Sequence, residues 1–212
     1  MSRYKETFNT WDKQAKIYQD KFMVYDLYND TYDTFLESLN NRQNSKVLEI
    51  GCGPGNITKY LLTKSRELDI TAIDVSPKMI ELAKHNNPLA QCLVMDAREI
   101  SKLNKLYDAI ICGFCIPYLN NSDCLKLIED CNNLLSKSGI LYLSFVEGNY
   151  TDSGYLIGFS GDRVYFCYHN LELLQKNLKT NSFEVEQIIH KRYMKVDKKE
   201  EVHTIIIARK KL

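Results

Sequence analysis

Residues 47–58 read VLEIGCGPGNIT, an apolar run followed by three glycines and a proline within five positions. KVLEI (46–50) predicts a short buried strand, and ITKYLLTKS (57–65) predicts a helix capped by Asn56. A glycine-rich turn between a strand and a helix brings backbone N–H groups and the helix N-terminus close to a ligand, because no side chain obstructs the approach. This stretch therefore predicts a ligand-binding strand–turn–helix unit.

The alternation of strand and helix continues along the chain. Strands are predicted at 69–75, 90–97, 106–114 and 139–147, the last after a stop at Ser138-Gly139, and helices at 78–86, opened by Ser76-Pro77, at roughly 122–136 and at 170–180. Apolar strands separated by helices are typical of a parallel sheet covered on both faces. Residues 183–195 and 201–210 then alternate as two strands joined by the charged turn VDKKEE (196–201).

Two segments depart from this alternation. Residues 8–39 carry apolar and aromatic residues in steps of three and four, which predicts an amphipathic helical cap that ends at the turn NNRQNS (40–45). Residues 148–168 are rich in glycine and aromatics and lack helical spacing, which predicts an inserted lid or hairpin after the fifth strand. Because no repeat and no linker interrupts the chain, we expect a single domain over residues 1–212.

The composition is that of an ordinary globular protein with balanced charge. Lys and Arg number 28 against 27 Asp and Glu, so the net charge of +1 provides no field to attract nucleic acid or an anionic membrane. We therefore expect a small-molecule partner, no nucleic acid, no membrane, and a monomer or homodimer. The N-terminus is polar and no apolar stretch is long enough to span a bilayer, which favours a cytoplasmic location.

Seven cysteines lie scattered through apolar runs, which predicts reduced thiols in a reducing compartment. Cys112 and Cys115 have the C-x-x-C spacing of a redox or metal motif. No second C-x-x-C and no nearby histidine pair completes a zinc site, so we expect no metal.

Acidic residues follow the second and third predicted strands. Asp74 lies about 20 residues after the glycine-rich turn, where an acidic side chain accepts hydrogen bonds from the ribose hydroxyls of an adenosine ligand. Asp96 ends the third strand, where it is placed to meet the adenine amino group. Both predicted strand ends lie on the edge at which open α/β sheets bind ligands.

The pattern E-x-G-x-G-x-G formed by Glu49, Gly51, Gly53 and Gly55, followed by Asp74 and Asp96-Ala97, resembles the class I S-adenosylmethionine-dependent methyltransferases. LLSKSGILYLSF (134–145) also resembles the family's segment entering the fifth strand. The resemblance implies an α/β fold: a Rossmann-like three-layer sandwich whose seven-stranded sheet has the order 3-2-1-4-5-7-6, strand 7 antiparallel. It further implies N-terminal helices and an inserted lid after strand 5. One departure is Ser182, where relatives often carry Gly.

The resemblance implies S-adenosyl-L-methionine as the cofactor and S-adenosyl-L-homocysteine as its product. The cofactor-binding residues that it implies are Glu49, Gly51, Cys52, Gly53, Asn56, Asp74, Val75, Met79, Asp96, Ala97 and Cys112, together with Tyr18 and Phe22 from the N-terminal helices.

A nicotinamide or flavin Rossmann domain is the main competing interpretation, and it requires G-x-G-x-x-G. Counted from Gly51 the sixth position is Asn56, and counted from Gly53 it is Thr58, so neither frame fits. Pro54 would also remove a backbone N–H from the phosphate-binding turn. A sulfonium ligand has no pyrophosphate, so it tolerates that loss.

The end of the fourth strand borders the transferred methyl group in this family. Related enzymes that methylate exocyclic base nitrogens carry [DNS]-P-P-[YF] there, whereas CGFCIPYL (112–119) shares only Pro117-Tyr118 with that motif. The difference argues against nucleic-acid bases and leaves a small-molecule acceptor methylated at O, N or C. The candidates for acceptor handling are Tyr118, Tyr155, Arg163, Tyr168 and His169, of which Tyr118 and His169 are the catalytic candidates.

We expect the segment 148–168 to form the substrate wall. The alternative function is a cofactor-binding or partner-regulating protein of the same fold without transfer activity. An acceptor cavity under 148–168 favours the enzyme, and a lid packed shut favours the binding role.

Overall fold

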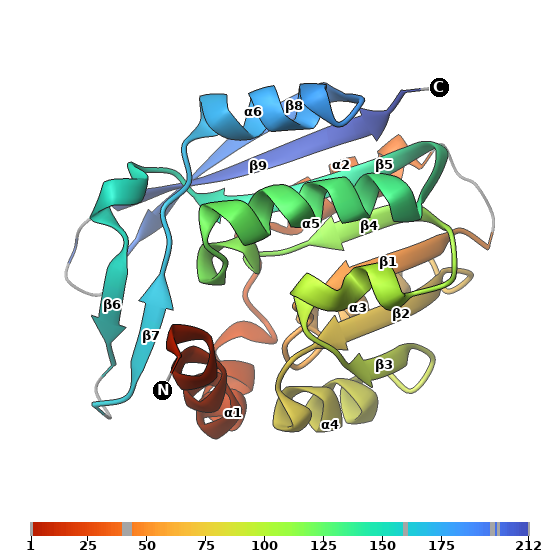
Figure 1. Cartoon of the computed structure of the whole chain (residues 1–212). Helices are drawn as coiled ribbons and strands as arrows, with labels where there is room; N and C mark the ends of the chain where they lie inside the picture. The colour runs from red at the N-terminus through yellow and green to blue at the C-terminus, as the bar shows by residue number, and fades with distance from the viewer. Residues whose placement is uncertain (1, 40–43, 159–160, 196–197, 199, 212) are drawn as a thin grey trace.

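The computed structural model describes residues 2–39, 44–158, 161–195, 198 and 200–211. A seven-stranded sheet with the order β3-β2-β1-β4-β5-β9-β8 forms its centre (Figure 1). Its strands are β1 (Lys46–Ile50), β2 (Asp69–Asp74), β3 (Gln91–Val94), β4 (Tyr107–Cys112), β5 (Leu135–Val146), β8 (Phe183–Met194) and β9 (Glu200–Lys210). A separate two-stranded sheet pairs β6 (Gly154–Ile157) with β7 (Arg163–Phe166).

The direction of the strands agrees with the expected fold. Strands β1 to β5 run parallel, and β9 runs antiparallel to both β5 and β8. The predicted sixth and seventh strands correspond to β8 and β9, because the β6–β7 hairpin stands outside the main sheet. The predicted order, with its antiparallel last strand, is therefore confirmed.

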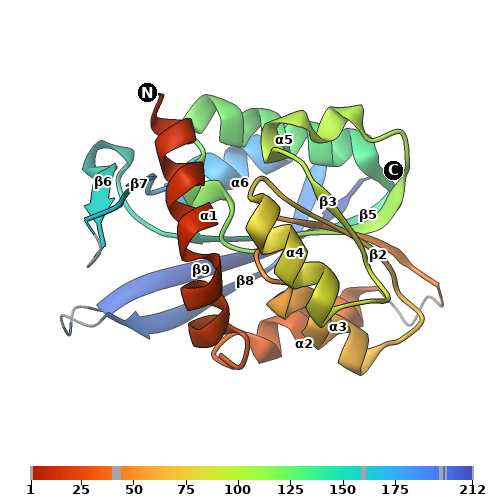
Figure 2. The ribbon, with the colours of Figure 1, turned by 90° about the horizontal axis from the view of Figure 1, so that it is seen from below.

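Helices cover both faces of the sheet, which makes three layers (Figure 2). They are α1 (Arg3–Phe22), α2 (Asn29–Ser38), α3 (Asn56–Lys64), α4 (Pro77–Asn86), α5 (Asn121–Leu134) and α6 (Leu171–Thr180), with the short 3-10 helices η1 (Ala97–Lys102), η2 (Ile116–Tyr118) and η3 (Tyr150–Asp152). One apolar core joins the sheet to α5 and α6, and a second joins it to α2, α3 and α4. Burial on both faces explains why the central strands read as continuous apolar runs.

The N-terminal region forms two helices where the pattern of residues 8–39 predicted one helical cap. Helix α1 begins earlier than expected, because the side chain of Ser2 accepts a hydrogen bond from the N–H of Lys5. The chain then leaves the helix between Phe22 and Asn29, although the sequence has neither Gly nor Pro there. Aromatic packing between Phe22, Tyr25 and Tyr28 overrides the helical spacing at this point.

Several predicted boundaries shift. Asn56 is the first residue of α3 and not its cap, since Gly55 occupies the N-cap position. Strand β5 begins at Leu135, before the predicted stop at Ser138-Gly139, and Ser138 takes a left-handed φ of 59° within it. Residues 40–43 of the first predicted turn, and 196–197 and 199 of the charged turn, lie outside the described residues.

The segment 148–168 contains the predicted hairpin, apart from residues 159–160, which also lie outside the described residues. Strand β7 lies along α1, with the hydroxyl of Thr10 donating to the carbonyl of Arg163 at 2.7 Å. The N–H of Tyr165 donates to the hydroxyl of Thr7 at 2.9 Å. The hairpin therefore braces the outer side of α1 (Figure 1).

All seven cysteines fall within the described residues, and each is a free thiol. None of the helices in the described ranges combines the length and the apolar character needed to cross a bilayer.

Candidate functional site

The glycine-rich turn after β1 allows close approach of other parts of the chain. Gly51 and Gly53 have left-handed φ angles of 72° and 53°. A Cβ on Gly51 would lie 2.7 Å from the Cβ of Cys115, and a Cβ on Gly53 would lie 3.5 Å from Cε1 of Tyr18. The turn is thus enclosed by the segment after β4 on one side and by α1 on the other.

Asp74, at the carboxyl end of β2, fixes this turn. Its Oδ2 accepts from the N–H of Gly53 at 2.9 Å, and its Oδ1 accepts from the N–H of Ser76 at 2.9 Å. Burial raises the pKa of the carboxyl group, and the backbone hydrogen bonds oppose that rise. Asp74 therefore links the glycine turn to the start of α4.

Asp96, after β3, is held by its own neighbour. Its carboxylate accepts from Nε of Arg98 at 3.0 Å and from the Arg98 N–H at 2.9 Å, and it pairs with the second guanidinium nitrogen at 2.6 Å. Burial opposes the charged form, but the hydrogen bonds from Arg98 prevail and lower the pKa of Asp96. Asp96 is therefore an ionised acceptor at the edge of the same pocket.

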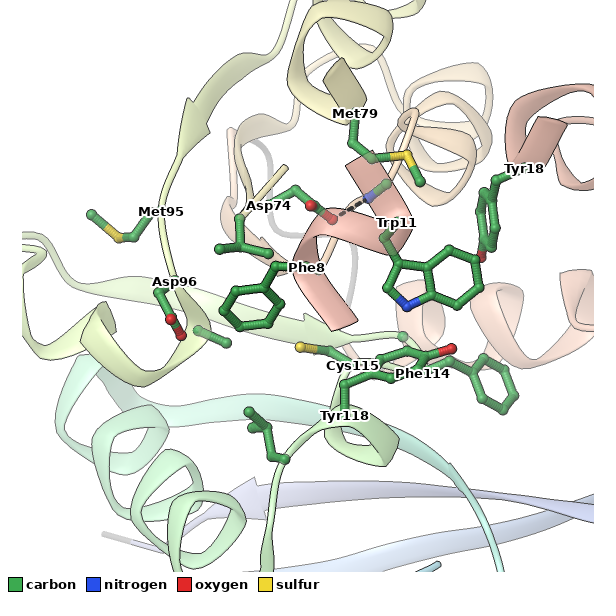
Figure 3. Close-up of a pocket in the computed structure, with 16 residues that line it drawn as sticks. Phe8, Trp11, Tyr18, Asp74, Met79, Met95, Asp96, Phe114, Cys115 and Tyr118 are labelled. Carbon is green, nitrogen blue, oxygen red and sulfur yellow. Dashed lines mark hydrogen bonds between the residues drawn. The ribbon is translucent and has the colours of Figure 1, made fainter. Parts of the chain in front are cut away.

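A pocket of about 110 Å³ lies over the carboxyl ends of the strands (Figure 3). Its wall consists of Phe8, Trp11, Tyr18, Gly51, Gly53, Asp74, Val75, Met79, Met95, Asp96, Ala97, Gly113, Phe114, Cys115, Tyr118 and Leu119. Aromatic rings from α1 form one side of the pocket, and the turn after β1 faces them. Among the described residues that line it, Asp74 and Asp96 are the two carboxylates, and none is Lys, Arg or His.

Trp11 stands between two tyrosines in this wall. Its ring lies edge-on to Tyr18 at 5.6 Å and to Tyr118 at 5.5 Å between ring centroids, an arrangement visible in Figure 3. Its Nε1 is shielded from solvent and has no hydrogen-bond partner among the described residues. A buried indole N–H normally finds an acceptor, so this donor is available to a ligand.

The structure divides the predicted cofactor residues into two groups. Those that line the pocket are Tyr18, Gly51, Gly53, Asp74, Val75, Met79, Asp96 and Ala97. The others are Glu49, Cys52 and Cys112, which are buried beneath it, and Phe22 and Asn56, which line a separate hollow of about 200 Å³.

Glu49 is fully buried under the glycine turn. Its Oε2 accepts a hydrogen bond from the hydroxyl of Thr58, and its Oε1 has no partner among the described residues. Desolvation by burial raises the pKa of Glu49 to about 8, against the opposing hydrogen bonds from Thr58. Glu49 is therefore a mostly protonated carboxyl group at neutral pH.

The predicted acceptor residues do not gather in one place. Tyr118 lines the pocket, where burial raises its pKa. His169 is buried outside the pocket, with Nε2 at 2.8 Å from the carbonyl of Ile116, and burial lowers its pKa. Its ring supports the segment before α5 and does not face a ligand space.

Tyr155 and Arg163 lie on the far side of α1. Arg163 Nε pairs with Oε1 of Glu6 at 2.7 Å, and its guanidinium covers the ring of Tyr155 at 4.3 Å. Tyr168 borders a hollow beside the β8–β9 hairpin. No described residue of 148–168 lines the pocket, although Phe166 of β7 packs edge-on against Tyr118 of its wall at 5.9 Å between ring centroids. That this segment forms the substrate wall stays a prediction, as does the distinction between an open and a closed lid over it.

The sequence interpretation missed most of the remaining lining residues. No sequence motif assigns Phe8, Met95, Gly113, Phe114, Cys115 or Leu119 to the site, and Trp11 falls within the helical cap predicted for residues 8–39. A helical stripe predicts which residues are buried, but it does not say whether they face the sheet or a ligand. No group of three or more His, Cys, Asp or Glu side chains suited to a metal occurs within the described ranges.

Comparison with known proteins identifies the fold and the motif. The model of a family described as "Methyltransferase domain" matches residues 47–139, which contain the glycine turn, Asp74 and Asp96. Residues 47–139 are therefore similar to methyltransferase domains. The match covers the strand ends that carry the pocket, so the similarity and the site geometry concern the same residues.

Relatives and solved structures agree with this family. The chain is 34% identical over 153 residues to malonyl-[acyl-carrier protein] O-methyltransferase of Priestia megaterium (70% of this chain, 53% of the relative). It is 31% identical over 98 residues to demethylmenaquinone methyltransferase of Thermotoga maritima (46% and 42%). It superimposes on the structure of N-methyltransferase NodS of Bradyrhizobium japonicum in complex with S-adenosyl-L-homocysteine, with a TM-score of 0.71 and 18% identity. The superposition covers 97% of this chain and 98% of the NodS chain.

The chain spans about half the length or less of these curated relatives. The solved structure is distant in sequence and shows the shared fold.

Proposed function

We propose that the protein transfers a methyl group from S-adenosyl-L-methionine to a small-molecule acceptor by in-line displacement. The observation that carries this proposal is the pocket at the carboxyl ends of the strands, where the glycine turn, Asp74 and Asp96 meet. Ligands of open α/β sheets bind at this edge. The family match over residues 47–139 supports the same activity.

The residues present fit this cofactor. The Asp74 carboxylate can accept from ribose hydroxyls, and the apolar side chains of Met79, Met95 and Leu119 suit the faces of a purine. The indole N–H of Trp11 is a shielded donor without a partner among the described residues. Tyr18 of α1 lies against the Gly53 turn, so we expect Tyr18 and the rest of α1 to move outward as the cofactor enters.

When bound, the sulfonium supplies an electrophilic methyl group. The chain's contribution is to align donor and acceptor and to exclude water, for which well-oriented pairs gain effective molarities of about 10⁵ M or more. The rings of Trp11, Tyr18 and Tyr118 favour a cation in the pocket, since aromatic faces attract positive charge. These rings also keep the methyl-transfer path free of water.

The acceptor is proposed to be a small molecule, because the pocket is narrow and the net charge of +1 does not favour a polyanion. The relatives' names refer to different acceptors, so they do not select one for this chain. We further propose one domain over residues 1–212, a monomer or homodimer, and a cytoplasmic location, the last supported by the seven free thiols.

Two measurements test the proposal in sequence. Isothermal titration calorimetry with S-adenosyl-L-homocysteine should show binding, and absence of binding would overturn the cofactor assignment. Turnover of S-adenosyl-L-methionine is then measured against a panel of metabolites, with the methylated product detected by mass spectrometry. Cofactor binding without turnover on any acceptor would instead favour a cofactor-binding protein without transfer activity.

A further inference from the structure

A buried histidine lies one ring away from the proposed methyl-transfer pocket. His203, on β9, is 7% exposed and lies between Tyr193 of β8 and Tyr28, which precedes α2. The ring centroids lie 4.8 Å from Tyr193 and 6.0 Å from Tyr28, with interplanar angles of 13° and 14°. Tyr193 thus stacks on the His203 ring from the paired strand, and Tyr28, which is 175 residues away in sequence, meets the edge of the same ring.

The two ring nitrogens of His203 face different polar groups. Its Nδ1 lies 2.6 Å from the hydroxyl of Tyr28, and its Nε2 lies 3.7 Å from Oε2 of Glu201. Nε2 is shielded from solvent and makes no hydrogen bond to the described residues. A carboxylate near Nε2 favours the tautomer with hydrogen on that atom, which leaves Nδ1 to accept the Tyr28 O–H. The sequence Tyr–His–Glu follows the logic by which a carboxylate orients a histidine base.

His203 and Tyr28 both have the protonation states that a proton transfer from Tyr28 to His203 requires. Burial lowers the pKa of His203, partly opposed by Glu201, so the imidazole is neutral at pH 7. Burial also raises the pKa of Tyr28, so its hydroxyl keeps its proton until the histidine takes it.

Phe114 connects the stack to the pocket. Its ring lies 5.0 Å from both Tyr28 and His203, and its side chain also lines the pocket beside Tyr118 (Figure 3). The backbone of Phe114 has a φ of 51°, which a bulky side chain rarely adopts, and its N–H donates to the hydroxyl of Ser144 at 2.8 Å. Strained residues held by such bonds concentrate at functional sites. A single ring therefore separates Tyr28 and His203 from the pocket.

We propose that Tyr28, His203 and Glu201 accept the proton of a planar aromatic hydroxyl acceptor that displaces the Phe114 ring. This inference rests on the proposed methyltransferase function and names the substrate class for the same site. The flat stack suits an aromatic ring, and a cavity wall without Lys, Arg or His among its described residues does not suit a carboxylate acceptor. An amine attacks through its own lone pair and can lose its proton afterwards, whereas a neutral hydroxyl needs a base as the bond forms.

The step balances as follows. A lone pair of the acceptor oxygen forms the new O–C bond, and the C–S bond breaks with its electron pair going to sulfur, which becomes a neutral thioether. The acceptor O–H proton passes to the Tyr28 oxygen as the Tyr28 proton passes to Nδ1 of His203. The resulting imidazolium faces the Glu201 carboxylate, and solvent later removes the proton.

The groups around His203 that titrate or carry charge are few. Glu201 lies on β9, and Lys195, just after β8, pairs with it at 2.9 Å. Lys191 lies opposite His203 on β8 and pairs with Asp30. Among the described residues, Tyr28 and Tyr193 contact the His203 ring, Glu147, which follows β5, accepts from Thr204, and His190 of β8 lies 4.0 Å from that Glu147 carboxylate. The pH profile of transfer therefore reports on His203 within this environment.

The experiment compares phenols of graded acidity as acceptors for the wild type and for Tyr28→Phe, with S-adenosyl-L-methionine supplied. For phenols that are protonated at the assay pH, the variant should lose about 100-fold or more in kcat, because the proton acceptor is gone. For nitrophenols, which are largely ionised already, the loss should be no more than about twofold. The matched control is Tyr60→Phe, which removes a hydroxyl that donates to Oδ1 of Asp33 at 2.8 Å, between α3 and α2.

Calorimetry with S-adenosyl-L-homocysteine separates the possible failures. Loss of cofactor binding in the wild type would refute the methyltransferase proposal itself. Binding without methylation of any phenol would overturn the acceptor class alone. If Tyr28→Phe lowers kcat equally for all phenols, or no more than Tyr60→Phe does, then the pair of Tyr28 and His203 has only a structural role and the inference is overturned. A loss that grows with the pKa of the phenol supports it.

Discussion

At the scale of single residues, Asp74 combines two tasks that are usually considered separately. Its carboxylate faces the pocket, and it also holds the N–H groups of Gly53 and Ser76 at 2.9 Å each. A ligand that bonds to Asp74 therefore binds to a group whose direction the backbone already fixes. Preorganisation of this kind lowers the cost of binding.

Asp74→Ala should weaken the binding of S-adenosyl-L-homocysteine by about 1–3 kcal/mol, because a charged hydrogen-bond partner is lost. It should also lower the free energy of unfolding, since two backbone donors lose their acceptor. Calorimetry and urea denaturation measure the two effects. Asp69→Ala is the control, because Asp69 lies at the opposite end of β2 and pairs with Lys105 at the surface. Unchanged affinity in Asp74→Ala would refute the ribose assignment.

Glu49 makes stability depend on pH. Folding raises its pKa from 4.5 to about 8, so between these values the folded protein holds a proton that the unfolded chain releases. The contribution is fully present below pH 4.5, and the free energy of unfolding falls as the pH rises toward 8. The fall is on the order of 1 kcal/mol per pH unit.

In Glu49→Gln the side chain is neutral at every pH, so this decline should disappear. Urea denaturation of the wild type and the variant at pH 5 and pH 8 gives the free energy of unfolding of each. Relative to the wild type, the free energy of unfolding of the variant should rise by about 2 kcal/mol or more between pH 5 and pH 8. Parallel pH curves for the two proteins would show that Glu49 is ionised in the folded state.

At the scale of elements, α1 is the segment that encloses the proposed cofactor. It supplies Phe8, Trp11 and Tyr18 to the pocket. Polar contacts fasten it on both sides: Asp12 accepts from the hydroxyl of Ser76 at 2.7 Å and from the N–H of Lys78 at 3.0 Å, and Thr7 and Thr10 bond to β7. The β6–β7 hairpin thus supports α1, and α1 supplies the side chains that line the pocket.

Asp12→Ala should release α1 from the start of α4. We expect S-adenosyl-L-homocysteine to associate a few times faster, because the enclosing helix opens more often, while the free energy of unfolding falls by about 1 kcal/mol. Stopped-flow kinetics give the association rate. Asp20→Ala on the same helix removes only an exposed pair with Lys16, so its kinetics should match the wild type. Equal association rates for both variants would exclude α1 opening as the limiting step.

The turn between α6 and β8 contains a residue with a strained backbone conformation, which a substitution can relieve. Ser182 has a φ of 59°, in the left-handed region that favours Gly. Ser182→Gly should raise the free energy of unfolding by about 0.5–1 kcal/mol, since Gly adopts this conformation without a steric cost. Ser182→Ala separates the backbone effect from loss of the hydroxyl, because Ala keeps the strain. Thermal unfolding of the wild type and the two variants measures these effects. Equal stability of Ser182→Gly and Ser182→Ala would contradict the assignment of backbone strain to residue 182.

At the scale of the whole molecule, a ligand that closes the pocket should stabilise the entire fold. The pocket is built from α1 and from the ends of the central strands, so binding to the folded state shifts global unfolding. At about 100 times its Kd, S-adenosyl-L-homocysteine should add about 2.7 kcal/mol and raise the Tm by about 5–10 °C. Differential scanning fluorimetry measures the shift. A Tm that stays constant at saturating ligand would show that the ligand does not select the folded state.

The alternation of strands and helices and the glycine–Asp74–Asp96 edge could be predicted from the sequence, because both depend on local spacing along strands and turns. The order of the sheet followed only from the resemblance to a known family. The position of the wall could not be predicted, since it depends on which elements pack together over long distances. No local pattern shows that residues of α1 line the pocket while the described residues of 148–168 do not. His203 and Tyr28 are separated by 175 residues, and no local pattern brings them together.

The position of Trp11 gives the protein a natural optical probe. It is the one tryptophan in the sequence, and it stands in the pocket wall between Tyr18 and Tyr118. Indole emission depends on the polarity and the ring contacts around it, so excitation of this residue reports events in the pocket without interference from a second tryptophan. Occupancy of the pocket and motion of α1 can therefore be followed in real time by intrinsic fluorescence, without attaching a dye.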